Sequence, residues 1–256
     1  MIRVILSGCN GQMGQAIAAR AENQAEIEIV AGVDNAGDLR YAFPVFDRFD
    51  ALDAQADMVI DFSHVSLTPS LLDYCKDKQL PLVLCTTGIA GDLEAKVMQT
   101  AKNIPIFQSF NMSVGVSLLR SLVHLAAKAL GDTYDIEIIE KHHNQKVDAP
   151  SGTALMIAEA VASALPYEPV YVHDRSATHK KRDRQEIGIH AIRGGSIVGV
   201  HEVLFIGPQE TISISHTAES RVLFATGAIK AAFFLASRQS PGLYNMDDLV
   251  QASLDA

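Results

Sequence analysis

RVILSGCNGQMG, residues 3–14, decides the fold, because it reads as a buried strand followed by a glycine turn and the start of a helix. The apolar run from Val4 to Leu6 suits a strand that is covered on both faces. The glycines have the spacing G-x-x-G-x-x-G, with Asn10 where the commoner G-x-G-x-x-G pattern has its middle glycine. Asn tolerates left-handed backbone angles better than most residues, so the stretch still predicts the turn of a dinucleotide-binding unit.

Short apolar strands alternate with amphipathic helices through the first half of the chain, which is the pattern of parallel βαβ units. Gly131 ends the last of these helices, and one strand, one helix and three β-rich runs follow it. We therefore predict an α/β protein: a Rossmann-like parallel sheet domain plus a smaller α+β domain with an open mixed sheet. The expected strands are 3–7, 28–33, 58–62, 82–85, 105–108, 135–141, 187–192, 196–206 and 211–216, and the expected helices are 13–23, 66–78, 92–102, 114–130, 153–165 and 222–237.

The change of pattern places a domain boundary near Asn111. A chain of 256 residues has the length of one large domain or two modest ones, and the pattern favours two. We expect residues 1–111 to form a dinucleotide-binding domain that the C-terminal segment 221–256 completes. Residues 112–220 are expected to form the second domain, which would bind the substrate.

The composition favours a soluble, cytoplasmic protein that binds neither nucleic acid nor membrane. A formal net charge of −9 disfavours attraction to anionic polymers and lipids, and no apolar run approaches the roughly 20 residues that span a bilayer. The opening MIRVILSG runs directly into a strand and leaves no room for a secretion signal. Cys9, Cys75 and Cys85 lack a CxxC pair and fit reduced thiols. The basic run HKKRDR, 179–184, reads either as a solvated loop or as a flap that attracts an acidic substrate.

Asp34 favours a dinucleotide site over a coincidental tight turn. It ends the second predicted strand about 20 residues past Gly14, where a carboxylate can accept hydrogen bonds from an adenosine ribose. Asn35 rather than Arg follows it, and a carboxylate repels a 2′-phosphate. We therefore predict NADH in preference to NADPH, with Arg40 as the cation that would favour NADPH.

Two further stretches follow strands that end at the same edge of the predicted sheet, where open parallel sheets bind their ligands. CTTG at 85–88 offers hydroxyls and a glycine turn, and SFNM at 109–112 ends the fifth strand. Each reads as cofactor contact or as ordinary loop chemistry, and their position after successive strands favours cofactor contact. DFS at 61–63 has a similar position, without a preference between the two interpretations.

EIIEKHHNQKVDAPSGT, residues 137–153, concentrates the chemistry of a site for an anionic substrate. His142 and His143 are consecutive, so on a strand they point to opposite sides, and Lys146 follows closely. The turn then opens a helix whose first backbone N–H groups can bind an anion. Imidazole, with a reference pKa of about 6.5, can donate a proton at neutral pH, and an ammonium group can bind a carboxylate. A structural histidine and a metal site are the rival interpretations, but the H-x-x-x-H or H-E-x-x-H spacing of metal sites is absent around this pair.

The run EKHHNQKVDAPSGTA, residues 140–154, closely resembles the signature of the 4-hydroxy-tetrahydrodipicolinate reductase (dihydrodipicolinate reductase) family, which acts in the diaminopimelate route to lysine. The likeness extends to the glycine turn, to the Thr-Thr-Gly turn, to Asn111 with SVGV at 113–116, and to IRGG at 192–195 with the following Val-Gly. It implies a Rossmann-like cofactor domain and a substrate and oligomerisation domain whose open sheet builds a homotetramer. It also implies reduction of 4-hydroxy-tetrahydrodipicolinate, a cyclic dicarboxylate, to tetrahydrodipicolinate with hydride from NADH or NADPH.

The resemblance also implies roles for individual residues. His142 corresponds to the proton donor, or to the group that orients a donating water, and Lys146 to a second donor. Substrate contacts correspond to His143, Ser151, Gly152 and Thr153. Dinucleotide contacts correspond to Gly8, Cys9, Asn10, Gly11, Gln12, Met13, Asp34, Cys85, Thr86, Thr87, Ser109, Phe110, Asn111 and Met112.

Two positions depart from the pattern of the family, and two other functions compete with the one it implies. Many relatives carry Arg where this chain has Asn35, and Met112 occupies a position that is aromatic in some members. A nicotinamide-dependent dehydrogenase of an amino or oxo dicarboxylate would share the first domain but would not need the His-His-x-x-Lys and Ser-Gly-Thr combination. A redox-sensing module would need a partner-binding segment, and the acidic chain offers no basic helix-turn-helix.

Overall fold

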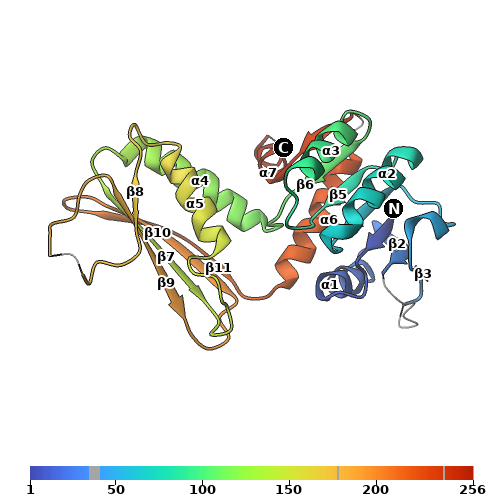
Figure 1. The fold of residues 1–256 in the computed structure, drawn as a ribbon, viewed down its shortest axis with the longest axis horizontal. Coiled ribbons are helices and arrows are strands. Elements are labelled where there is room, and N and C mark those ends of the chain that lie inside the picture. The colour runs from blue at the N-terminus through green and yellow to red at the C-terminus, as the bar shows by residue number, and fades with distance from the viewer. Residues whose placement is uncertain (35–40, 178, 239, 256) are drawn as a thin grey trace. The chain divides into compact units, whose positions relative to one another are not determined.

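The computed structural model describes residues 1–34, 41–177, 179–238 and 240–255, and it divides into two compact units (Figure 1). Unit 1 comprises Met1–Ser113 and Val222–Ala256, and unit 2 comprises Val114–Arg221. Each unit has its own sheet and its own apolar core. Among the described residues, no helix is long and apolar enough to cross a membrane.

Unit 1 is built on a parallel sheet of seven strands in the order β12-β6-β5-β4-β1-β2-β3. Its central strands are short apolar runs that are closed to solvent, because helices cover a parallel sheet on both faces. The order, in which β1 lies between β4 and β2, confirms the predicted Rossmann-like sheet. The strands are β1 (Ile2–Ser7), β2 (Ile27–Val33), β3 (Val45–Phe46), β4 (Met58–Asp61), β5 (Leu82–Leu84), β6 (Pro105–Gln108) and β12 (Gly242–Tyr244).

The helices of unit 1 form two layers, α1 with α6 and α2 with α3 (Figure 1). Apolar side chains of α2 and α3, such as Leu71 and Val97, pack on the strands in one core cluster. α2 has a proline in its first turn and ends at Gln79 in the left-handed conformation, so its ends follow common capping preferences. The helices are α1 (Gln12–Ala21), α2 (Thr68–Lys78), α3 (Asp92–Ala101), α6 (Val222–Ala236) and α7 (Met246–Leu254), with short 3₁₀ turns η1 (Phe49–Ala51) and η2 (Val65–Leu67).

The chain returns to unit 1 after completing unit 2. α6 contacts the strands β4, β5 and β6, and β12 then pairs in parallel with β6 as the seventh strand. α7 starts with a reciprocal capping box between Asn245 and Asp248. The short strands β3 and β12 were not predicted, since two or three residues carry too little alternation to identify a strand, and α7 was not predicted either.

Unit 2 contains a mixed sheet of five strands in the order β11-β10-β7-β9-β8, as predicted for the second domain. The pairs β7–β9 and β8–β9 are parallel, whereas β7–β10 and β10–β11 are antiparallel. The sequence analysis missed β8. The strands are β7 (Asp135–His142), β8 (Val170–Val172), β9 (Glu186–Arg193), β10 (Gly199–Ile206) and β11 (Thr211–Ala218).

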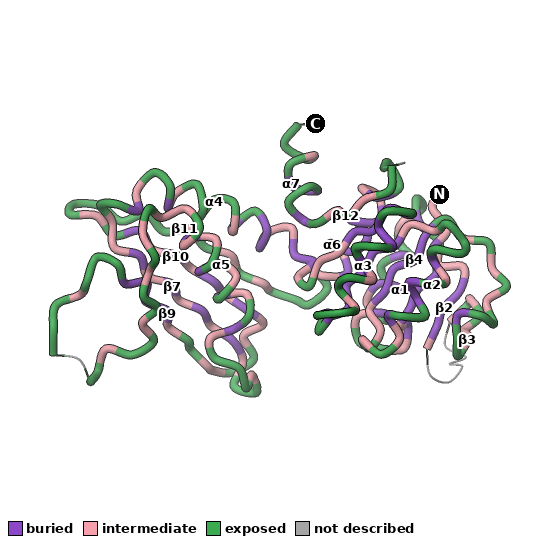
Figure 2. The backbone as a smooth tube through the Cα atoms, turned by 45° about the horizontal axis from the view of Figure 1, so that its top comes forward, coloured by how far each residue is buried: buried purple, intermediate pink, exposed green. Residues whose placement is uncertain are grey.

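Two helices, α4 (Val114–Leu130) and α5 (Gly152–Ala162), pack on one face of this sheet. Burial alternates strictly along β7, so that Ile136, Ile138, Glu140 and His142 face the helices and are buried (Figure 2). The residues between them lie on the opposite face, which we call the open face. The alternation has a direct consequence for function, because it puts two polar residues at the carboxyl end of β7 on the covered face.

Candidate functional site

The candidate site in unit 2 begins with His142, the last residue of β7. Its side chain is only 11% exposed, and its Nδ1 lies 2.6 Å from Oε2 of Glu140, two residues earlier on the same face. Glu140 has no solvent exposure. A buried carboxylate is tolerated only when other groups satisfy its charge and its hydrogen-bonding capacity, so the partners of Glu140 define the site.

Arg193 and the backbone of Ser151 complete the shell around Glu140. Arg193, at the end of β9, donates from both terminal nitrogens, to Oε2 at 2.8 Å and to Oε1 at 2.7 Å. The Ser151 N–H donates to Oε1 at 3.0 Å. Burial raises the pKa of the Glu140 carboxyl, but the hydrogen bonds from Arg193, His142 and Ser151 outweigh it and hold that pKa below its usual value. Glu140 is therefore ionised at neutral pH.

The loop from His143 to Ser151 connects this cluster to α5. Within it, Lys146 Nζ lies 2.7 Å from Asp148 Oδ1, and this hydrogen bond lowers the pKa of Asp148. Asp148 is half exposed, and such exposed ion pairs contribute little stability, so a substrate carboxylate could take its place beside Lys146. Arg193 also donates to the Asp148 carbonyl at 2.6 Å, which ties the loop to β9.

The predicted anion-binding turn forms the start of α5. Ser151 is the N-cap, and its Oγ accepts from the Ala154 N–H at 3.2 Å. The Gly152 N–H donates to no other described residue, and a Cβ added at Gly152 would meet no atom within 4 Å. Gly152 itself is exposed, so its amide, at the positive end of the helix dipole, is available to a ligand. Thr153, the next residue, is half-buried in the first turn.

His201 belongs to the same cluster and was missed by the sequence analysis. It lies on β10 opposite Glu140, its ring meets that of His142 edge to face with centroids 5.2 Å apart, and its Nε2 lies 3.1 Å from Ser151 Oγ. Burial and the neighbouring His142 lower the pKa of His201 to about 4, so His201 is neutral at pH 7. A signal was present in the sequence, because His201 occupies the same alternation as Val203 and Phe205, both buried.

Gly199, on β10, leaves space beside the His142 ring. A Cβ added at Gly199 would lie 3.2 Å from His142 Nε2 and 3.5 Å from Cδ2. His142 Nε2 has no hydrogen-bond partner in the part of the chain that the structure describes. The imidazole is therefore fixed at Nδ1 and available at Nε2.

In unit 1 the glycine turn after β1 has the geometry that close backbone contact requires. Gly8 has φ +76°, and a Cβ there would lie 2.7 Å from the Phe62 backbone; one at Gly14 would lie 2.2 Å from the Gly8 carbonyl oxygen. Asp34 Oδ2 accepts the Asn10 N–H at 2.8 Å, so this carboxylate also braces the turn. Asn35 and Arg40, on which the predicted cofactor preference partly depends, lie outside the described residues.

A pocket in unit 1 collects part of the predicted cofactor set. Its walls include the predicted Met13, Cys85, Thr86, Thr87, Phe110 and Met112, together with Phe62, Ser63 and Phe224. For residues 61–63 the sequence favoured neither cofactor contact nor ordinary loop chemistry. Phe224 on α6 was not predicted to belong to the site. The pocket follows the carboxyl ends of β4 and β5, which is where open parallel sheets bind ligands.

Other predicted cofactor residues do not line this pocket. Gly11 is the N-cap of α1, which Gln12 begins, and the Cys9 thiol is buried at 0% exposure. Ser109 and Asn111 shape the loop that carries Phe110 and Met112. Ser109 Oγ donates to the Asn111 carbonyl at 2.8 Å, and Asn111 Oδ1 accepts the Ser113 N–H at 2.9 Å.

Asp61 holds two of the residues that line this pocket, Thr86 and Ser63. It is fully buried at the end of β4, its Oδ2 accepts the Thr86 hydroxyl at 2.5 Å, and its Oδ1 accepts the Ser63 N–H at 3.2 Å. Burial, with the nearby Asp61, raises the pKa of the Cys85 thiol well above its usual value. Cys85 is therefore a neutral apolar wall, not a nucleophile.

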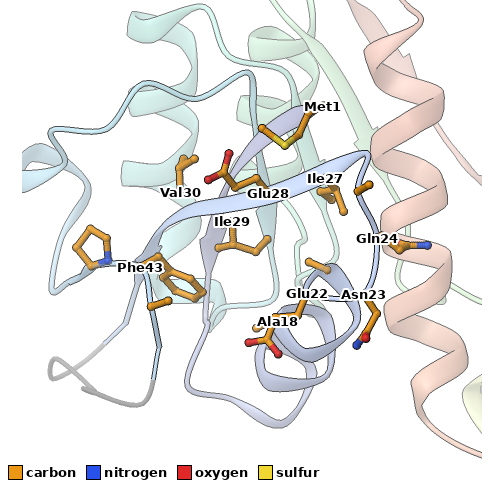
Figure 3. Close-up of a pocket in the computed structure, with 14 residues that line it drawn as sticks. Met1, Ala18, Glu22, Asn23, Gln24, Ile27, Glu28, Ile29, Val30 and Phe43 are labelled. Carbon is orange, nitrogen blue, oxygen red and sulfur yellow. The ribbon is translucent and has the colours of Figure 1, made fainter.

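A second pocket of unit 1 lies beside the amino-terminal half of β2 and the end of α1 (Figure 3). Glu22 and Glu28 contribute carboxylates to its wall, and none of the predicted site residues lies there. The negative charge of these two carboxylates would repel the phosphates of a dinucleotide. In the described part of the chain, no group of three or more His, Cys, Asp and Glu residues is placed to hold a metal ion.

Two family models match nearly the whole chain: dihydrodipicolinate reductase, N-terminus, over residues 2–112, and dihydrodipicolinate reductase, C-terminus, over residues 115–250. The chain belongs to the dihydrodipicolinate reductase family. A 4-hydroxy-tetrahydrodipicolinate reductase of Clostridium tetani is 50% identical over 98% of both chains. One from Caldanaerobacter subterraneus is 50% identical over 98% of this chain and 99% of its own.

A solved structure of a dihydrodipicolinate reductase from Paenisporosarcina sp. TG-14, bound to dipicolinate, is similar over 96% of this chain and 97% of that one. Its TM-score is 0.80 and its sequence identity 25%. The family, the fold class and the assignment as a reductase of lysine and diaminopimelate biosynthesis, all predicted from the sequence, are confirmed. A nicotinamide cofactor belongs to this family's chemistry, and the glycine cradle at Gly8 and Gly14 fits its phosphates.

Proposed function

We propose that the chain reduces 4-hydroxy-tetrahydrodipicolinate to tetrahydrodipicolinate, with unit 1 binding the dinucleotide and unit 2 binding the dicarboxylate. The observation that carries the proposal is the buried Glu140–His142 pair beside the exposed amide of Gly152 at the start of α5. It joins an acid–base group to an anion site in one rigid piece of unit 2. The dipicolinate bound to the similar solved structure supports a dicarboxylate ligand.

His142 would move the proton of the reaction at Nε2. Loss of the 4-hydroxyl group as water gives the substrate a conjugated C=C–C=N system. A bound nicotinamide dinucleotide would supply a hydride to the electron-poor end carbon of that system, and the adjacent enamine carbon then needs a proton, which restores the C=N bond of the product. In its protonated form His142 carries that proton on Nε2, because Nδ1 is held by Glu140. It would deliver the proton to the carbon directly or through a water that it orients.

The substrate carboxylates would be held by cations and amides around His142. Lys146 would exchange Asp148 for a carboxylate of the substrate, and it could also act as a second donor. The amides of Gly152 and Thr153 would bind through the helix dipole, with His143 beside them and Ser151 as the cap that orients the turn. Each group acts by positioning the ring for hydride and proton transfer.

Substitutions in this cluster test the roles of its residues. His142→Gln and Lys146→Ala should each lower kcat by about 10²-fold or more, since each removes a group that acts in the transition state. His190→Gln, on the open face, is the matched control and should keep nearly wild-type turnover. Oxidation of the cofactor with freshly generated substrate gives the rates, and near-normal kcat in both site variants would overturn the assignment.

Unit 1 would bind the dinucleotide through the glycine turn and the loops after β4, β5 and β6. Gly8 to Met13 would hold the phosphates, Asp34 the adenosine ribose, and 85–87 with 109–112 the remainder. Since Asp34 repels a 2′-phosphate, we propose a preference for NADH, with NADPH as a possible second cofactor. Steady-state kinetics with each cofactor decides the matter, and a clearly higher kcat/KM with NADPH would refute the preference.

The homotetramer implied by the family resemblance would use the open face of the unit 2 sheet. α4 and α5 both pack on the other face, and the open face carries half-buried apolar side chains such as Ile139, Val200 and Leu204. Sedimentation should give four times the mass of one chain, and a Leu204→Glu variant should give smaller species. A cytoplasmic location accords with three thiols that are all free and buried, and cell fractionation would check it.

A further inference from the structure

We propose that Glu140 and Arg193 are positioning residues: together they fix Nε2 as the proton-exchanging atom of His142 and join this imidazole to the start of α5. The inference rests on the proposed function of His142 and deepens it. Neither residue has a substrate or cofactor contact in this proposal. Both would act through the ring and the helix that they hold.

Glu140 determines which ring nitrogen of His142 exchanges the proton. An ionised carboxylate can only accept hydrogen bonds, so the 2.6 Å contact between Glu140 Oε2 and His142 Nδ1 requires a proton on Nδ1. In neutral imidazole this leaves Nε2 as the free acceptor, and in imidazolium Nε2 carries the second proton. The proton that comes and goes is therefore the one on Nε2, which Gly199 leaves accessible.

The groups around the His142 ring keep Glu140 ionised and limit the positive charge beside the imidazole. Glu140 faces His142 from its own strand, Arg193 from β9 and His201 from β10, with Lys146 in the loop that follows. The bidentate Arg193 keeps Glu140 ionised, so that the carboxylate stabilises the imidazolium without taking its proton. His201 stays neutral, so it adds no positive charge to those of Arg193 and Lys146.

Glu140 and Arg193 also join the imidazole to the proposed anion site at the start of α5. Oε1 of Glu140 accepts the N–H of Ser151, the N-cap of α5, while Arg193 donates to the carbonyl of Asp148 in the same loop. One carboxylate thus sets both the orientation of the imidazole and the position of the helix start. A ligand carboxylate at α5 would be held at a fixed distance from Nε2.

The open face of β7 supplies a matched control. Glu137 Oε2 lies 2.7 Å from His190 Nε2, and Glu137 also bonds Arg175 and Arg182. The residue types and the strand are the same, but the cluster lies on the face opposite to His142. Glu137→Gln therefore makes the same chemical change in the same strand without contact with His142. Because the open face is also the proposed tetramer interface, sedimentation first shows that this variant and wild type have the same assembly.

The experiment compares Glu140→Gln with Glu137→Gln in the full chain. We expect kcat to fall by about 10²- to 10⁴-fold in Glu140→Gln, since neutralising the buried carboxylate behind the imidazole of a Ser-His-Asp triad lowers kcat by about 10⁴-fold. The pH at which kcat falls to half should drop, because the imidazolium loses its carboxylate while Arg193 remains. Glu137→Gln should leave both quantities unchanged.

A second readout does not depend on activity. Nitrogen-15 NMR of histidine-labelled protein reports which ring nitrogen is protonated, and His142→Gln identifies the resonance. Wild type should show the Nδ1–H form of neutral His142, and Glu140→Gln should show a large Nε2–H population. An unchanged tautomer together with an unchanged pH midpoint would overturn the inference, even if kcat fell.

The two proposals fail in different ways. Near-normal turnover in His142→Gln removes the proposed role of His142, whereas normal turnover in Glu140→Gln beside an inactive His142→Gln removes only the positioning role. If Glu140→Gln does not fold, Arg193→Lys replaces it. That variant keeps the positive charge but loses the bidentate grip, and it should show smaller changes of kcat and of the pH midpoint in the same direction.

Discussion

Two clusters of Glu, Arg and His are built on opposite faces of the strand β7. On the covered face, Glu140 binds His142 and Arg193; on the open face, Glu137 binds His190 with Arg175 and Arg182. In both clusters burial raises the pKa of the carboxyl and its hydrogen bonds more than compensate, so both carboxyls have lowered pKa values. The direction of the carboxyl pKa shift alone therefore does not distinguish the two clusters.

The surroundings of the two rings do distinguish them. The His142 side chain is 11% exposed and that of His190 is 39% exposed. Glu140 holds His142 by Nδ1 and leaves Nε2 available, whereas Glu137 holds His190 by Nε2. Only the covered cluster adjoins a helix start with an exposed amide. The comparison shows that the same residue types become a reaction site through burial, choice of ring nitrogen and a neighbouring anion site, and not through an ion pair alone.

The largest expected difference between the clusters concerns stability. Arg193→Met leaves the fully buried Glu140 without a cation, and breaking such a pair costs about 3–5 kcal/mol. Arg175→Met leaves Glu137 with Arg182 and His190 and leaves the buried Glu186 with Lys180, so the loss should be smaller, about 1–3 kcal/mol. Denaturant unfolding followed by far-ultraviolet circular dichroism measures both, and equal losses would show that burial does not separate the clusters.

The next effect is the acid sensitivity that His201 gives to the covered cluster. Its pKa of about 4 in the folded protein lies below the usual histidine value of 6.5, so the unfolded chain binds the extra proton first as pH falls. The contribution is fully present above about pH 6.5 and is lost progressively towards pH 4. At about 1.4 kcal/mol per pH unit, the loss amounts to about 3 kcal/mol.

Unfolding free energies of wild type and His201→Gln at pH 7, 5.5 and 4 check this prediction. Gln keeps a hydrogen-bonding group near Ser151 but has no titrating ring, so the variant should lose about 3 kcal/mol less than wild type between pH 7 and 4. Parallel curves for wild type and His201→Gln would contradict the prediction.

The sequence predicted one part of the covered cluster and not the other, for a physical reason. The local run from Glu140 to Thr153 places His142, Lys146 and the start of α5 within a few residues of one another, so motif and alternation suffice. Arg193 and His201 come from strands about 50 residues farther along. Their positions depend on the register of β7 with β9 and β10, which one sequence does not fix.

The cofactor domain shows the same limit. The alternation of apolar strands and helices predicted four of its helices and five of its strands within two residues, because periodicity is a local property. It could not distinguish a buried Cys9 from a pocket-lining Cys85, because both follow strands. Phe224 reaches the same pocket from α6, beyond the whole of unit 2 in sequence.

The smallest expected effect tests whether access to Nε2 matters. In Gly199→Ala the new methyl group would lie 3.2 Å from His142 Nε2, tighter than an ordinary contact, so it would cover the nitrogen or turn the ring. Gly194→Ala, at the end of β9, is the control, since its methyl group would meet no atom within 4 Å. Alanine costs no backbone entropy relative to glycine, so neither variant should lose its fold.

We expect kcat to fall by about tenfold in Gly199→Ala, equivalent to about 1.4 kcal/mol of barrier, and by less than about twofold in Gly194→Ala. Equal turnover in the two variants, at equal melting temperatures, would mean that the reacting proton does not pass through Nε2, and the distinction drawn between the covered and the open histidine would lose its chemical basis.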